Sequence, residues 1–88
     1  MKRKDNSILK KLGNRFMILP LSDHNISADV ILYTNEVGAF IYNHLENETT
    51  REDVLAAILA EYDVDRETAL KDLNAFLDSM KEKGLLND

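Results

Sequence analysis

The apolar period of this chain changes from strand-like to helix-like between positions 29 and 45. The four consecutive residues Val30 to Tyr33 form a continuous run of strand formers. Thr34 and Asn35 follow, and both are residue types that cap helices. Apolar side chains then recur at the spacing of one helix face, at Val37, Phe40, Ile41 and Leu45. The chain therefore passes directly from a strand into a helix, and nothing in this segment looks catalytic.

Two more strand patterns precede this segment and two more helix patterns follow it. We expect strands over 7–12, 15–21 and 29–34, with a tight turn at Gly13-Asn14 between the first two. Helices are expected over 36–45, about 50–62 and 66–83, with Thr49 or Thr50 capping the second helix and Asp65 the third. Gly84 suits the left-handed residue after a helix end. The predicted fold is α+β, a three-stranded antiparallel sheet followed by three helices in a winged-helix-like arrangement.

The length and the charge distribution limit the function classes. Eighty-eight residues allow one domain, predicted over 7–88, preceded by a flexible polar arm over 1–6. Residues 1–15 hold six Lys/Arg and one Asp, whereas residues 16–88 hold five Lys/Arg and fifteen Asp/Glu. An acidic body repels phosphate backbones, which argues against nucleic acid as a partner. The basic arm is interpreted as a solvated tail, with attraction of an acidic peptide as the alternative.

The composition also argues against enzyme, metal and membrane chemistry. The chain has no cysteine, which fits a cytoplasmic protein, and no apolar run long enough to span a bilayer. Its two histidines, His24 and His44, lack the local spacing of metal ligands. No glycine-rich phosphate loop or acid–base pair is apparent. We therefore expect a non-catalytic protein without a cofactor.

The strand order predicts an open edge. A tight hairpin places the first strand beside the second, so the third strand most simply joins the other side of the second and keeps one unpaired edge. The last helix is long enough to lie along that edge and form a groove with it. An edge beside a groove can capture an extended peptide by strand addition. At 100° per residue, Leu70 and Leu77 lie at one margin of the apolar face of this helix and favour a groove role.

Three stretches resemble the PqqD family of precursor-peptide recognition domains. Leu32-Tyr-Thr-Asn35 with Val37-Gly-Ala-Phe-Ile-Tyr42 is similar to the strand and first helix of the family. The segment from Thr49 to Tyr62-Asp-Val-Asp65 is similar to its second helix and the following turn. Asp72-Leu-Asn-Ala-Phe-Leu77, Met80 and Gly84-Leu-Leu86 are similar to its last helix and ending. The resemblance covers residues 7–87.

The resemblance implies a peptide chaperone that binds the leader of a ribosomally made precursor. It implies presentation of that leader to a modifying enzyme, often a radical SAM enzyme, as in coenzyme PQQ synthesis or a related pathway. The leader would add as a strand along the backbone of the third strand and pack against the last helix. The residues expected to bind it are Val30, Ile31, Leu32, Tyr33, Leu70, Lys71, Leu73 and Leu77.

Two other functions fit the same pattern of elements. A winged-helix DNA-binding protein also combines three helices with a small sheet, although the last two helices carry more acidic than basic residues. A structural adaptor would contact a modifying enzyme without binding peptide. The open edge allows either a monomer or a homodimer paired through that edge.

Overall fold

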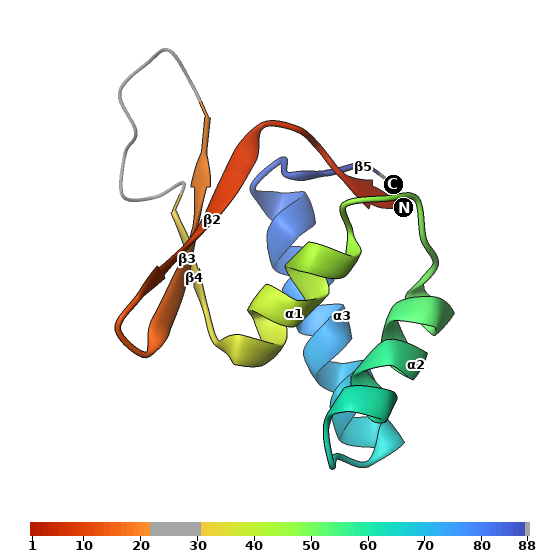
Figure 1. The fold of residues 1–88 in the computed structure, drawn as a ribbon. Coiled ribbons are helices and arrows are strands. Elements are labelled where there is room, and N and C mark those ends of the chain that lie inside the picture. The colour runs from red at the N-terminus through yellow and green to blue at the C-terminus, as the bar shows by residue number, and fades with distance from the viewer. Residues whose placement is uncertain (22–30, 88) are drawn as a thin grey trace.

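The structure is a computed structural model that describes residues 1–21 and 31–87. Its elements, in chain order, are β1 (Lys2–Arg3), β2 (Ser7–Leu12), β3 (Arg15–Pro20), β4 (Leu32–Thr34), α1 (Glu36–His44), α2 (Arg51–Glu61), α3 (Arg66–Glu82) and β5 (Leu86–Asn87). A sheet of β2, β3 and β4 lies at one side of the molecule, and the three helices pack together at the other (Figure 1). The predicted α+β fold is therefore confirmed.

The sheet has the predicted order, with β3 in the centre and antiparallel neighbours on both sides. Leu12 pairs with Arg15, so the hairpin turn consists of Gly13 and Asn14 alone. Gly13 has a φ of 62°, a conformation that glycine adopts without steric cost. On the other side of β3, Ile18 pairs with Leu32 and Met17 with Tyr33. This register makes β2 and β4 the two edges of the sheet.

The helices begin and end at the residues that their local chemistry indicates. Asn35, Thr50 and Asp65 each accept a hydrogen bond from the backbone N–H three residues later, at 3.0, 3.1 and 3.1 Å. The Thr68 hydroxyl also donates to Asp65, and these bonds to Thr68 lower the pKa of the Asp65 carboxyl. Gly84 ends α3 with a φ of 71°. The Leu85 N–H then donates to the Met80 carbonyl at 2.9 Å, as in a Schellman motif.

Asn35 offers a direct test of this capping. Its side chain supplies the acceptor for the Gly38 N–H at the point where β4 passes into α1. Replacing Asn35 with alanine is expected to lower the free energy of unfolding by about 1 kcal/mol, because one N–H of the first turn loses its partner. A urea titration of both proteins measures the difference. Equal midpoints and slopes would show that Asn35 does not stabilise the helix.

The core lies between the helices and one face of the sheet. Its fully buried members come from β3, all three helices and the C-terminal segment, and they include Ile18, Ile41, Tyr42, Leu45, Leu55, Ile58, Leu73, Leu77, Met80 and Leu85. Leu9 and Leu32 pack against this cluster from the same sheet face as Ile18. The opposite face of the sheet contributes none of the described core residues.

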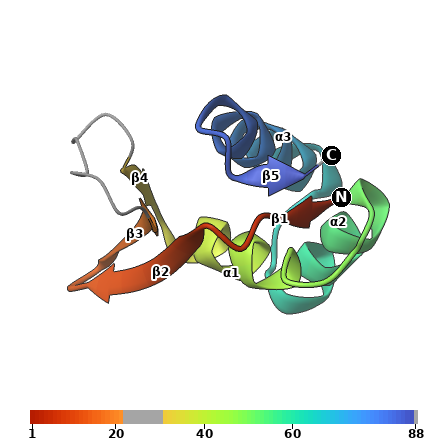
Figure 2. The ribbon, with the colours of Figure 1, turned by 90° about the horizontal axis from the view of Figure 1, so that it is seen from above.

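Residues 1–6, for which the sequence predicts a flexible arm, contact the rest of the chain in the structure. Lys2 and Arg3 form β1, which pairs antiparallel with Asn87 and Leu86 of β5 (Figure 2). The Arg3 N–H donates to the Leu45 carbonyl at 2.8 Å, and the terminal ammonium lies 2.6 Å from a carboxylate oxygen of Glu48. A two-residue strand has no hydrophobic period, so these long-range contacts leave no signal in the local sequence.

Tyr42 of α1 contacts the chain at two positions near the N-terminus. Its hydroxyl is 2.8 Å from the Ser7 hydroxyl in a buried pair, and the Arg3 guanidinium lies 4.3 Å from the centre of its ring. The cation and the ring attract each other, and the paired hydroxyls leave no unsatisfied polar atom between them. Tyr42 therefore joins α1 to β1 through Arg3 and to the start of β2 through Ser7.

Candidate functional site

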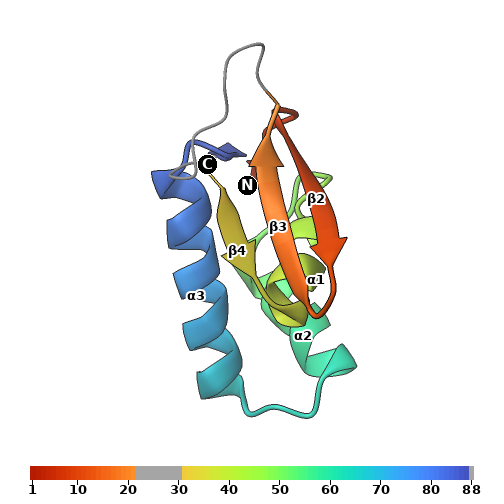
Figure 3. The same cartoon turned by 90° about the vertical axis from the view of Figure 1, so that its left-hand side faces the viewer.

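β4 has β3 on one side and α3 on the other (Figure 3). Among the described residues, β4 pairs with β3 alone, so the N–H and C=O groups on its other side have no strand partner. The space between β4 and α3 is a groove of about 260 Å³. An open strand edge and a groove therefore lie side by side, as the sequence predicts.

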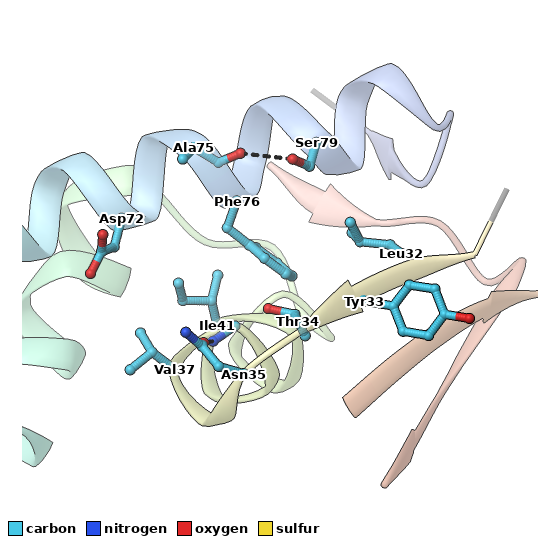
Figure 4. Close-up of a pocket in the computed structure, with 11 residues that line it drawn as sticks. Leu32, Tyr33, Thr34, Asn35, Val37, Ile41, Asp72, Ala75, Phe76 and Ser79 are labelled. Atoms are coloured by element: carbon cyan, nitrogen blue, oxygen red, sulfur yellow. Dashed lines mark hydrogen bonds between the residues drawn. The ribbon is translucent and has the colours of Figure 1, made fainter. Parts of the chain in front are cut away.

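The groove is lined from three elements. β4 and the turn after it contribute Leu32 to Asn35, and α1 contributes Val37, Gly38 and Ile41. From α3 come Asp72, Ala75, Phe76 and Ser79, which recur at the spacing of one helix stripe. The Phe76 ring points from α3 toward α1 and β4 and forms the floor between them (Figure 4).

The groove is apolar at its centre and polar at its two ends. Phe76 and Ile41 are 8 and 1 % exposed and form the apolar part. Asp72 lies toward the end nearest Val37, and Ser79 lies toward Leu32 (Figure 4). The Ser79 hydroxyl donates to the Ala75 carbonyl at 3.1 Å. Among the described lining residues Asp72 is the one charged side chain, so the groove does not attract phosphate.

The two edges of the sheet differ in a way that distinguishes their uses. β2 carries two exposed lysines, Lys10 and Lys11, and lysine on an edge strand disfavours pairing with another chain. β4 consists of Leu32, Tyr33 and Thr34 and has no charge. The edge beside the groove therefore has no charged side chain that would oppose the addition of another strand.

Some of the predicted peptide-binding residues lie at this edge. Leu32 and Tyr33 line the groove, and Ile31 immediately precedes β4. The Tyr33 ring points away from α3, so Tyr33 faces the groove with its backbone (Figure 4). Val30 lies outside the described residues.

The predicted residues of α3 lie elsewhere. Leu73 and Leu77 are 0 and 1 % exposed and belong to the core cluster. Leu70 is half-buried against the core, and Lys71 is exposed on the helix surface. None of the four lines the groove that the described residues form. The groove opens at the other margin of the apolar face of α3, where the side chains are smaller and more polar.

The described part of the chain offers little else that could form a site. It contains no group of three or more His, Cys, Asp or Glu side chains placed to hold a metal ion. His44 is the last residue of α1, where its Nδ1 lies 2.9 Å from the Phe40 carbonyl oxygen. His24 lies outside the described residues. Within residues 1–21 and 31–87, no helix has the length and apolar character needed to cross a bilayer.

Comparison with known proteins identifies a family model and solved structures to which this chain is similar. The family model described as coenzyme PQQ synthesis protein D (PqqD) matches residues 25–86. The solved structure of TbiB1 in complex with the TbiA(beta) leader peptide is 31 % identical, with a TM-score of 0.73 over 99 % of this chain and 95 % of that one. Lasso peptide synthetase B1 complexed with its leader peptide is 21 % identical, with a TM-score of 0.70 over 99 and 96 % of the two chains, and it supports the fold. No curated protein matches the sequence.

Proposed function

This chain belongs to the PqqD family, and from that premise we propose that it binds the leader segment of a ribosomally made precursor peptide. The observation that carries the proposal is the uncharged, unpaired edge of β4 beside the groove along α3. The similarity to TbiB1, which was solved with a leader peptide bound, supports it.

In the proposed complex the leader adds as a fourth strand to the sheet. The backbone of Ile31 to Tyr33 supplies the ladder hydrogen bonds. A contact of Val30 with the leader stays a prediction, since Val30 lies outside the described residues. Alternate leader side chains point into the groove, where Leu32 and Phe76 offer apolar contact. The small side chains of Ala75 and Ser79 leave room for them.

The α3 residues predicted from sequence take indirect parts in this proposal. Leu73 and Leu77 hold α3 against the core and so fix the wall of the groove. Leu70 and Lys71 lie on parts of α3 that do not line the groove. The leader would contact them only if it continued beyond the groove onto the surface of α3.

We expect a Kd of about 1 μM for the leader, a binding free energy of roughly −8 kcal/mol. Ordering a flexible leader costs a few kcal/mol of the contact energy.

The protein acts, in this proposal, without a catalytic step of its own. It holds the leader while a modifying enzyme acts on the rest of the precursor. A radical SAM enzyme as that partner, and the PQQ pathway as the context, remain predictions. Location in the cytoplasm also remains a prediction, and it fits a chain that has no cysteine to form disulfides.

An amide-shift titration tests the proposal. The probes are synthetic copies of the N-terminal segments of short open reading frames that neighbour the gene for this chain. Saturating amide shifts are expected to be largest in residues 31–34 and 72–79, because these residues form the edge and the facing wall. Shifts confined to α2 would refute the groove as the binding site. No shift with the leader, together with binding to the enzyme, would favour the structural adaptor instead.

A further inference from the structure

The face of the sheet that points away from the helices carries exposed apolar side chains. In the described residues the large hydrophobic side chains with the greatest exposure are Ile8, Leu12, Leu21 and Tyr33, at 36, 66, 55 and 56 %. Side chains alternate between the two faces of a strand, and Leu9, Ile18 and Leu32 pack on the core. The intervening positions therefore share the opposite face. We call it the outer face and define it as Ile8, Lys10, Leu12, Arg15, Met17, Leu19 and Tyr33.

None of the outer-face side chains belongs to the core or packs against it, within the described part of the chain. In Figure 3 the sheet is seen from this side, with α1 and α2 behind it. An exposed apolar patch on a small protein marks an interaction site. The groove does not account for this patch, because the leader is expected at the edge of β4 and the Tyr33 ring points away from α3.

The charges on the outer face indicate what kind of surface would cover it. Lys10 lies in the central row of the face, beside Met17 and Tyr33, and Arg15 pairs with Leu12 at the hairpin end. Both cations are exposed, and neither forms a salt bridge within the described residues. Apolar side chains with two cations among them match an apolar surface bordered by carboxylates.

We propose that the outer face is the docking surface for the modifying enzyme, through an apolar patch of that enzyme with acidic side chains at its rim. The proposal rests on the proposed function, since an adaptor needs a second surface in addition to its peptide site. The leader strand would extend the same sheet, so the enzyme would meet the leader and the outer face side by side.

A second copy of this chain is a poorer match for the outer face. The exposed large hydrophobic residues of the described chain all lie on or next to this face, so another copy would have to stack through the same surface. A symmetric stack brings Lys10 and Arg15 of both copies into one interface, and like charges in an interface are unfavourable. A heterologous acidic partner avoids that repulsion.

Two neighbouring lysines supply a matched pair of variants. Lys10 points to the outer face, whereas Lys11 pairs with Phe16 and its ammonium lies 5.8 Å from the centre of the Phe16 ring, on the opposite side of the sheet. K10E and K11E change the net charge equally. The intact 88-residue chain is immobilised and titrated with the modifying enzyme that acts on the same precursor peptide.

The Kd for the enzyme is expected to rise at least tenfold in K10E and less than twofold in K11E. The apolar variant L12S should also weaken enzyme binding at least fivefold, with the leader Kd unchanged in all three proteins. Equal effects of K10E and K11E, or enzyme binding that is insensitive to K10E and L12S, would overturn the proposal. So would concentration-dependent dimerisation that L12S abolishes in sedimentation equilibrium. The separate titration with the leader shows whether the protein still binds peptide, so failure of the docking surface can be distinguished from failure of the proposed function.

Discussion

Replacing Gly38 with alanine is expected to lower the free energy of unfolding by about 2 kcal/mol, a typical cost of overpacking. A Cβ atom at position 38 would lie 1.7 Å from the Thr34 hydroxyl oxygen and 2.8 Å from the Thr34 Cβ. Neither separation is possible, so α1 would have to move away from β4. The first turn of α1 also forms the end of the groove, and its displacement should weaken leader binding as well.

The sign of this effect is informative because local propensity predicts the opposite. Alanine within a helix is more favourable than glycine by about 1 kcal/mol. A loss of stability in G38A therefore reports the contact between α1 and β4, and not the helix itself. Urea titration of the two proteins gives the difference.

A second substitution tests whether Thr34 is the cause. In the double variant G38A/T34A the hydroxyl and methyl groups of Thr34 are gone, and only the contact with its Cβ remains. Part of the lost stability should return, relative to the sum of the single variants. Stability of G38A equal to or above that of the natural sequence would show that α1 and β4 lie farther apart than described.

The features that sequence predicted well are those with local causes. Asn35, Thr50, Asp65 and Gly84 mark the helix ends because a cap needs only a side chain and the backbone a few residues away. The sheet order was predictable because a two-residue hairpin forces β2 and β3 together. The open edge of β4 follows from that order, and the structure agrees.

Two features of the structure differ from the expectations drawn from the sequence. The pairing of β1 with β5 joins the two ends of the chain through strands of two residues each, too short for any period. The sequence predicts that leucines of α3 form the wall of the groove, because apolar residues at the margin of a helix face favour a binding role. The structure instead lines the groove with Asp72, Ala75 and Ser79, together with Phe76.

A physical reason connects the small side chains with the groove. An added strand brings a whole backbone next to α3, and a row of leucines at that margin would fill the space it needs. Alanine and serine at i and i+4, Ala75 and Ser79, keep the space open. The position of the groove is therefore indicated in the sequence by small residues at helical spacing. A search for apolar residues alone does not detect them.

Filling that space should abolish most of the peptide affinity. The side chain of Ala75 is exposed and lines the groove, so a tryptophan there occupies volume that the leader needs. We expect A75W to raise the leader Kd at least 30-fold, a loss of about 2 kcal/mol. Stability should change by less than about 1 kcal/mol, since an exposed helix position bears mainly the difference in propensity.

Ala60 provides the matched control, because it is also an exposed alanine in a helix, on α2, and is not among the described lining residues of the groove. A60W makes the same chemical change and should leave the leader Kd within twofold. Isothermal titration of both variants with the leader peptide, beside urea titrations of each, separates blocked binding from unfolding. Equal leader affinities in A75W and A60W would mean that the peptide does not pass between β4 and α3, and the proposed function would then lose its site.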